Sequence, residues 1–365
     1  MRKLTINIGS WGGAGRYLLY LLAFWMVAIS SCSEGGRESV PEPPPVVDPP
    51  VGIGCWEGFN PQSDYMAVIG DVQSYVSESR YIPYFQQSMS WLAGQKRLGA
   101  NIVSMLFVGD LTDNNSHAQW CVFKDCSSLA SGDIMMVAVS GNHDYDWNRK
   151  GDRYDGIRDR RTCHLTQYAS TPLLQENIEE AFTLDSIDNI VVRQELAGRR
   201  IDIVALEFGV RPEVLARVAR HVSSHPERRY IVMTHELLNR NGTFVQNSYS
   251  WSQFHDYSPC STPEDVWEHL VYPNDNVIAM VCGHNGFAAV NTEKINVAGR
   301  AVPIVLFNLQ YLDNGGNGLV QLWEFPRDTN DVVLRVVDTG ASDYFTPPVG
   351  MDPPCCEFPI RFSYN

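Results

Sequence analysis

The chain has 365 residues, enough to bury a sizeable hydrophobic core and to form one large domain or two. It carries 28 lysines and arginines against 42 aspartates and glutamates, a formal net charge of −14, with no basic block. This balance argues against a nucleic acid or an anionic membrane surface as partner, but a bound metal ion could still attract a small anion.

Residues 1–32 have the pattern of an export signal. Arg2, Lys3 and Arg16 precede the apolar run YLLYLLAFWMVAI (17–29), which is too short to span a bilayer but suits a signal-peptide core. The small residues before Cys32 resemble a bacterial lipoprotein cleavage box, in which the cysteine becomes the lipidated first residue; an ordinary signal peptide is the alternative. We expect an exported protein, lipid-anchored through Cys32 in the cell envelope, on the periplasmic or outer-surface side.

A proline-rich linker at residues 33–53 separates this signal from a globular domain at 54–345. We expect the tail at 346–365 to pack on that domain. Export permits disulfides, and a bridge from Cys55 to Cys355 or Cys356 would tie the domain ends together. Cys282 lies inside an apolar run and is expected to be a buried thiol.

Short apolar runs recur along the domain, and their lack of alternation predicts strands covered on both faces. Six such runs span residues 65–70, 102–109, 134–141, 201–208, 230–234 and 277–283. Helical patterns lie between several of them. One helix precedes Gly99, a second begins at Pro212, and a capping signal at Thr262 predicts a third.

The last third of the domain is richer in strands. Apolar runs at 301–310, 318–325 and 331–337 follow one another without helices between them, which predicts an antiparallel extension. Alternating strands and helices first and consecutive strands later indicate an α/β sandwich built from mixed sheets.

Polar side chains follow directly after five of the apolar runs. Because ligand sites in open α/β sheets form beyond the carboxyl ends of the strands, we expect these side chains to converge. Carboxylates, an amide oxygen and imidazoles together suit divalent metal ions, and two such ions can clamp a phosphoryl group during its displacement. The residues are Asp71 and Gln73, Asp110 and Asp113, Asn142 and His143, His235, and His284.

The motif order D-x-Q, GDLTD, GNHD, TH and GH resembles the calcineurin-like metallophosphoesterase superfamily over about residues 64–340. This resemblance implies a four-layer α/β/β/α sandwich and hydrolysis of a small phosphate mono- or diester by metal-activated water, without a covalent intermediate. Four further segments are similar to its exported bacterial branch, namely LEFGVRP (206–212), MTHELL (233–238), CGHNG (282–286) and FNLQYLDNGGNG (307–318).

The resemblance also implies two metal positions. Asp110 would bridge two divalent ions, and the first position would be completed by Asn142, His235 and His284. Asp71 and Gln73 would hold the second ion.

The same resemblance assigns the catalytic residues. His143 would protonate the leaving oxygen, and Asp113 would orient His143. Asn114, beside Asp113, is assigned to substrate binding. Asp144 is interpreted as an acid that structures its loop.

Two departures from the family pattern fall on the second metal position. The family usually has D-x-H and G-H-x-H, whereas this chain has Gln73 and Gly286 in place of those two histidines. An oxygen-only position suits Mg²⁺ or Mn²⁺ and should bind more weakly than its neighbour. The histidine-rich position can hold Mn, Zn or Fe.

An exported metal-containing binding protein on the same scaffold is the alternative to an enzyme. His143 with Asp113 favours the enzyme, because a pure binder has no use for an acid at the leaving group. A purely structural domain would not need five polar strand ends. No nucleic acid is expected as a partner, and membrane contact is expected only through the N-terminal lipid; the substrate and the oligomeric state stay open.

Overall fold

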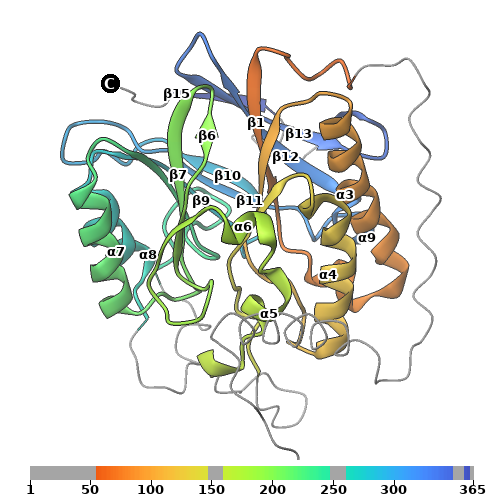
Figure 1. Ribbon diagram of the computed structural model, residues 1–365, viewed down its shortest axis with the longest axis horizontal. Helices are drawn as coiled ribbons and strands as arrows, with labels where there is room; N and C mark the ends of the chain where they lie inside the picture. The colour runs from red at the N-terminus through yellow and green to blue at the C-terminus, as the bar shows by residue number, and fades with distance from the viewer. Residues whose placement is uncertain (1–54, 147–158, 247–259, 348–356, 362–365) are drawn as a thin grey trace, which may run out of the picture. The chain divides into compact units, whose positions relative to one another are not determined.

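The computed structural model describes residues 55–146, 159–246, 260–347 and 357–361 (Figure 1). The predicted signal peptide with Cys32, the linker, and the proposed disulfide partners Cys355 and Cys356 lie outside these residues. Within the described ranges, no helix combines the length and the apolar character needed to cross a bilayer.

The described part of the chain alternates strands and helices before a strand-rich end. The strands are β1 (Ser63–Ile69), β2 (Ile102–Phe107), β3 (Met135–Ala138), β4 (Ile178–Ala181), β5 (Ile190–Val192), β6 (Glu195–Leu196), β7 (Arg199–Ala205), β8 (Arg229–Met233), β9 (Val277–Cys282), β10 (Phe287–Asn291), β11 (Ile304–Asn308), β12 (Leu319–Pro326), β13 (Asp331–Asp338), β14 (Asp343–Tyr344) and β15 (Glu357–Arg361). The helices are α2 (Gln73–Ser77), α3 (Ile82–Arg97), α4 (His117–Ser131), α5 (Leu165–Ala169), α6 (Pro172–Gln175), α7 (Pro212–Ser224), α8 (Pro263–Val266) and α9 (Asp313–Gly316), with 3₁₀ turns η1 (Ser79–Tyr81) and η2 (Arg160–Thr162) and the π-helical turn η4 (Trp267–Val271).

The strands form two mixed sheets, as the sequence predicts. The first has the order β14-β13-β12-β1-β2-β3, with β15 paired to β13. Its β1, β2 and β3 are parallel, while β12 is antiparallel to β1. The second has the order β10-β11-β9-β8-β7-β5-β4, with β6 paired to β7, and its four central strands are parallel.

The two sheets face each other, with helices on the outside. Ile203 of β7 and Ile231 of β8 share one core with Val68 of β1, so these side chains fill the space between the sheets. Their neighbours Val204 and Val232 belong to a second core, which contains the buried residues of α7. Figure 1 shows α3 and α4 outside the first sheet and α7 and α8 outside the second. The result is the predicted four-layer α/β/β/α sandwich.

The predicted helices form for local reasons that the sequence carries. α7 has Pro212 in its first turn and buries four apolar residues at helical spacing, Val214, Leu215, Val218 and Val222. α8 begins at a capping box, in which the Thr262 hydroxyl accepts from the Asp265 N–H and the Asp265 carboxylate accepts from the Thr262 N–H.

The strand-rich end departs from the prediction. β12 and β13 join the first sheet as antiparallel strands, but β11 inserts into the second sheet, parallel to β9 and antiparallel to β10. Predicting one antiparallel extension was therefore wrong for β11. All five of its residues are buried, and a fully buried run gives no sign of strand direction. The tail contributes β15, which pairs antiparallel with β13.

The core between the sheets yields a stability prediction. Ile203→Ala should lower the free energy of unfolding by about 2–5 kcal/mol, because it removes a fully buried side chain and leaves a cavity. Leu184→Ala is the matched control, since Leu184 is 90% exposed and its loss should cost less than about 0.5 kcal/mol. Urea unfolding followed by circular dichroism measures both, and equal losses would contradict the assignment of Ile203 to the core.

Candidate metal centre

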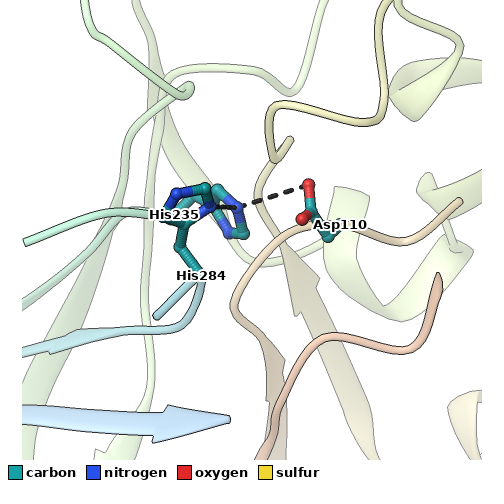
Figure 2. Close-up of side chains that lie close together, drawn as sticks. All are labelled: Asp110, His235 and His284. Atoms are coloured by element: carbon teal, nitrogen blue, oxygen red, sulfur yellow. Dashed lines mark hydrogen bonds and ion pairs between the residues drawn. The ribbon is translucent and has the colours of Figure 1, made fainter. Parts of the chain in front are cut away.

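The carboxyl ends of strands from both sheets meet at one edge of the sandwich. Asp110 follows β2, Asn142 follows β3, His235 follows β8 and His284 follows β9. Ligand atoms of Asp110, His235 and His284 lie within 4.8 Å of one another (Figure 2). Asp110 and His284 have positive φ values of 50° and 68°, a conformation that costs free energy and recurs at functional sites.

Hydrogen bonds fix which ring nitrogens face the centre. The Nδ1 of His235 lies 2.8 Å from the carbonyl oxygen of Val108, which can only accept, so this nitrogen carries the proton. The Nε2 of His284 lies 3.2 Å from Oε1 of Glu236. Metal-binding histidines are usually held in this way by a carbonyl or a carboxylate. Nε2 of His235 and Nδ1 of His284 are left 3.1 Å apart.

Four lone-pair donors converge on one point. Nε2 of His235 lies 3.3 Å from Oδ1 of Asp110, 3.1 Å from Oδ1 of Asn142 and 3.1 Å from Nδ1 of His284. Atoms that bind one ion at about 2.0–2.2 Å lie about 2.8–3.6 Å from each other, which matches these separations. A proton on Nε2 of His235 could form a hydrogen bond with only one of the three neighbouring atoms. A divalent ion could bind Nε2 and all three neighbours at once. The residues therefore fit a metal ion.

The charges of the centre also favour a cation. Burial opposes protonation of His235, but Asp110, Asp71 and the carbonyl oxygen of Val108 together outweigh it and raise the pKa of His235 to about 10. Burial, with a further contribution from Asp110, raises the pKa of Asp71 well above its usual range, although His235 opposes the shift. A site that attracts a proton this strongly also attracts a metal ion, which would displace the proton.

Asp71 lies beside this centre and is held by an amide network. Its Oδ2 accepts hydrogen bonds from the side-chain amides of Asn308, at 2.6 Å, and Gln310, at 3.0 Å. Its Oδ1 accepts the N–H of His284 at 3.1 Å. The carboxylate that the sequence assigns to the second metal position is thus fixed against the backbone of a residue from the first.

Gln73, the other residue assigned to the second position, begins α2. Its Oε1 is buried and has no hydrogen-bond partner among the described residues. A buried carbonyl oxygen without a donor is costly unless a cation or water satisfies it. This observation is compatible with a weak oxygen ligand at Gln73.

Three residues of this network are absent from the sequence prediction. Asn308, which is fully buried, donates both to Asp71 and, at 2.9 Å, to the carbonyl oxygen of His284. Gln310 and Glu236 support Asp71 and His284. In the sequence, only the positions of these residues hint at their role. Glu236 directly follows His235, and Asn308 and Gln310 lie at the end of an apolar run, as the predicted ligands do.

His143 lies at the same edge and is tied to Asp110. Its backbone N–H donates to Oδ1 of Asp110 at 2.9 Å, and its side chain is 20% exposed. Its Nδ1 lies 2.7 Å from the carbonyl oxygen of Asp113, whereas the Asp113 carboxylate lies 3.6 Å away. The backbone of Asp113 therefore makes the shorter contact. Asn114 is exposed, and its Oδ1 accepts the N–H of Ser116.

Asp144 holds the loops that carry the ligands, as expected. Its carboxylate accepts the N–H groups of Gly141, Leu111 and Thr112 at 2.7, 3.1 and 2.8 Å, and also the Thr112 hydroxyl. Burial and then the charge of Asp110 raise its pKa to about 6. A Cβ at Gly141 would lie 2.1 Å from the backbone nitrogen of Asp110, so only glycine allows this close approach.

The sequence of the chain is similar to those of known proteins. A family model described as "Calcineurin-like phosphoesterase" matches residues 65–286, more than half of the chain. The uncharacterized protein YvnB of Bacillus subtilis (strain 168) is 23% identical over 273 residues, which are 73% of this chain and 19% of that protein. The chain therefore spans about a fifth of the length of this curated relative.

The chain has a weak similarity to two solved structures. A purple acid phosphatase from yellow lupin (Lupinus luteus) seeds is 13% identical, with a TM-score of 0.47, and a 5'-nucleotidase precursor from Thermus thermophilus is 11% identical, with a TM-score of 0.39. Each match covers 82% of this chain and 54% of the other. At these scores the likeness carries no weight for substrate or mechanism.

The amide network yields a prediction about metal affinity. Asn308→Ala should weaken Mn²⁺ binding by about 10- to 100-fold, because groups that orient metal ligands typically contribute that much. Asn285→Ala is the matched control, since Asn285 lies beside His284 but its side chain donates to the carbonyl oxygen of Leu238. Isothermal titration calorimetry measures both affinities. An unchanged affinity in Asn308→Ala would show that metal binding does not depend on the hydrogen bond from Asn308 to Asp71.

Proposed function

The chain belongs to the calcineurin-like phosphoesterase family, and from this premise we propose that it is an enzyme that hydrolyses phosphate mono- or diesters with the help of divalent metal ions. The observation that carries the proposal is the convergence of Asp110, Asn142, His235 and His284 on one point. A metal-containing protein that only binds its ligand would have the same four residues, so the distinction depends on His143.

The side chains of the centre have separate tasks in this proposal. Divalent ions held there would supply a nucleophilic water and neutralise the charge of the phosphate. Asp110 accepts the backbone N–H of His143, which keeps the imidazole next to this carboxylate. Since Nδ1 of His143 donates to the carbonyl oxygen of Asp113, Nε2 is the atom that would give a proton to the leaving oxygen.

The two metal positions differ in their ligands. The first has two imidazoles, a carboxylate and an amide oxygen, which suit Zn²⁺, Mn²⁺ or iron. The second would be held by Asp71, Asp110 and the unpartnered Oε1 of Gln73, all oxygen atoms that suit Mg²⁺ or Mn²⁺. We propose that both ions are needed for turnover and that the second is the more easily lost.

The role of His143 can be tested with two leaving groups. His143→Ala should lower kcat by about 10²–10⁴-fold for an alkyl phosphate and much less for an activated aryl phosphate, because only the poor leaving group needs a proton. His269→Ala is the control, since His269 is an exposed histidine of η4. Steady-state kinetics and metal analysis are made on the same samples.

Equal losses on both substrates would contradict the acid role. Loss of metal from His143→Ala would show instead that the histidine holds the centre together. If the wild-type protein binds Mn²⁺ but hydrolyses neither of these monoesters nor an aryl phosphate diester, the binding-protein alternative is favoured.

The ligand asymmetry predicts unequal metal retention. After dialysis without chelator, one equivalent should remain in each chain, and activity should return when Mn²⁺ or Mg²⁺ is added. Gln73→His should move this activation to lower Mn²⁺ concentration, because an imidazole is a stronger ligand than an amide oxygen. Gln175→His, on the exposed face of α6, is the control. Two tightly held equivalents in the wild type would contradict the weak second position.

A further inference from the structure

Tyr311 is a large exposed side chain beside the metal centre. It follows β11 directly after Gln310, one of the two amides that hold Asp71, and it is 63% exposed. Its ring lies 6.4 Å from that of Phe287, centroid to centroid. An exposed tyrosine is not unusual on its own, so its position relative to the ligands decides its significance.

The ring of Tyr311 occupies the space that a side chain at position 286 would need. A Cβ built on Gly286 would lie 2.4 Å from Cδ2 and 2.7 Å from Cε2 of Tyr311. Position 286 is two residues after His284 and is one of the two departures from the family pattern at the second metal position. The glycine that removes a metal ligand therefore makes room for an aromatic ring.

The surroundings of Tyr311 point toward the centre. Burial of its hydroxyl, followed by the negative charges of Asp71 and Asp110, raises its pKa above the ordinary value. The hydroxyl therefore lies within electrostatic reach of both carboxylates. A ring that is open to solvent and packs against Gly286, two residues after His284, is suited to contact with an organic group.

A phosphate ester bound at the centre would place its phosphoryl group at the metal positions. Its leaving group would then extend toward the solvent-exposed side of the centre. We propose that Tyr311 contacts this leaving group and selects esters with a planar aromatic group over those with a saturated one. The inference rests on the proposed function. Packing between aromatic rings contributes about 0.5–1.5 kcal/mol beyond area burial, so a preference of about 2- to 10-fold is expected.

Benzyl phosphate and cyclohexylmethyl phosphate test this selectivity, because both have a primary alkoxide as the leaving group and differ in the ring alone. Wild-type protein in Mn²⁺ should favour benzyl phosphate in kcat/KM by about 2- to 10-fold. Tyr311→Ala should bring the ratio close to one, chiefly through KM, while Tyr311→Phe should keep it. Gly286→Ala should also reduce the ratio, since its Cβ must displace the ring.

Tyr344→Ala is the matched control. Tyr344 is 40% exposed and lies on β14, at the edge of the first sheet, so the ratio should stay at the wild-type value. An unchanged ratio in Tyr311→Ala, or a wild-type preference for the saturated ring, would overturn the inference while leaving the proposed function intact. If the wild type hydrolyses neither ester, the inference fails; if it also fails to hydrolyse an aryl phosphate diester, the proposed function fails with it.

Discussion

The structure depends on one electrostatic constraint: lone pairs from four side chains meet at a buried point, where their mutual repulsion needs a positive charge. Nε2 of His235 has two oxygen neighbours and one nitrogen neighbour at 3.1–3.3 Å. Hydrophobic packing alone would disperse such groups, because each loses its hydration. The sandwich holds these four side chains together because the carboxyl ends of the parallel strands of both sheets meet at one edge. The fold is thus the scaffold of this site.

The scaffold does not support the two proposed metal positions equally. The first receives rigid imidazoles whose outer nitrogens are fixed by Val108 and Glu236. The second depends on Asp71, whose orientation is set by neutral amides, and on the single unpartnered oxygen of Gln73. Under the proposed function, this difference in ligand type and support would make one ion tightly bound and the other exchangeable. The absence of a side chain at Gly286 leaves space for the ring of Tyr311. The proposed weaker metal position and the proposed substrate contact would then share one cause.

The sequence predicts the parts of this arrangement that are local. Each assigned ligand directly follows an apolar run, and a run followed by a polar residue is visible without knowledge of pairing. The direction of β11 is not visible in this way, because buried parallel and antiparallel strands can have the same composition. Three features depend on tertiary contacts that the sequence does not reveal. They are the hydrogen bonds from Asn308 and Gln310 to Asp71, the contact of Glu236 with His284, and the packing of Tyr311 against Gly286. The short contact of His143 is to a backbone carbonyl, which no side-chain pattern could predict.

The hydrogen bonds from Asn308 and Gln310 to Asp71 also bear on when this carboxylate is fixed during folding. Asn308 and Gln310 lie 237 and 239 residues after the carboxylate that they hold. Contacts of such long sequence separation tend to form late, because loop closure must come before the contacts that reward it. The ribosome must therefore complete nearly the whole domain before Asp71 is fixed in place. A chain truncated before β11 would therefore contain all six proposed ligands but lack the two amides that hold Asp71.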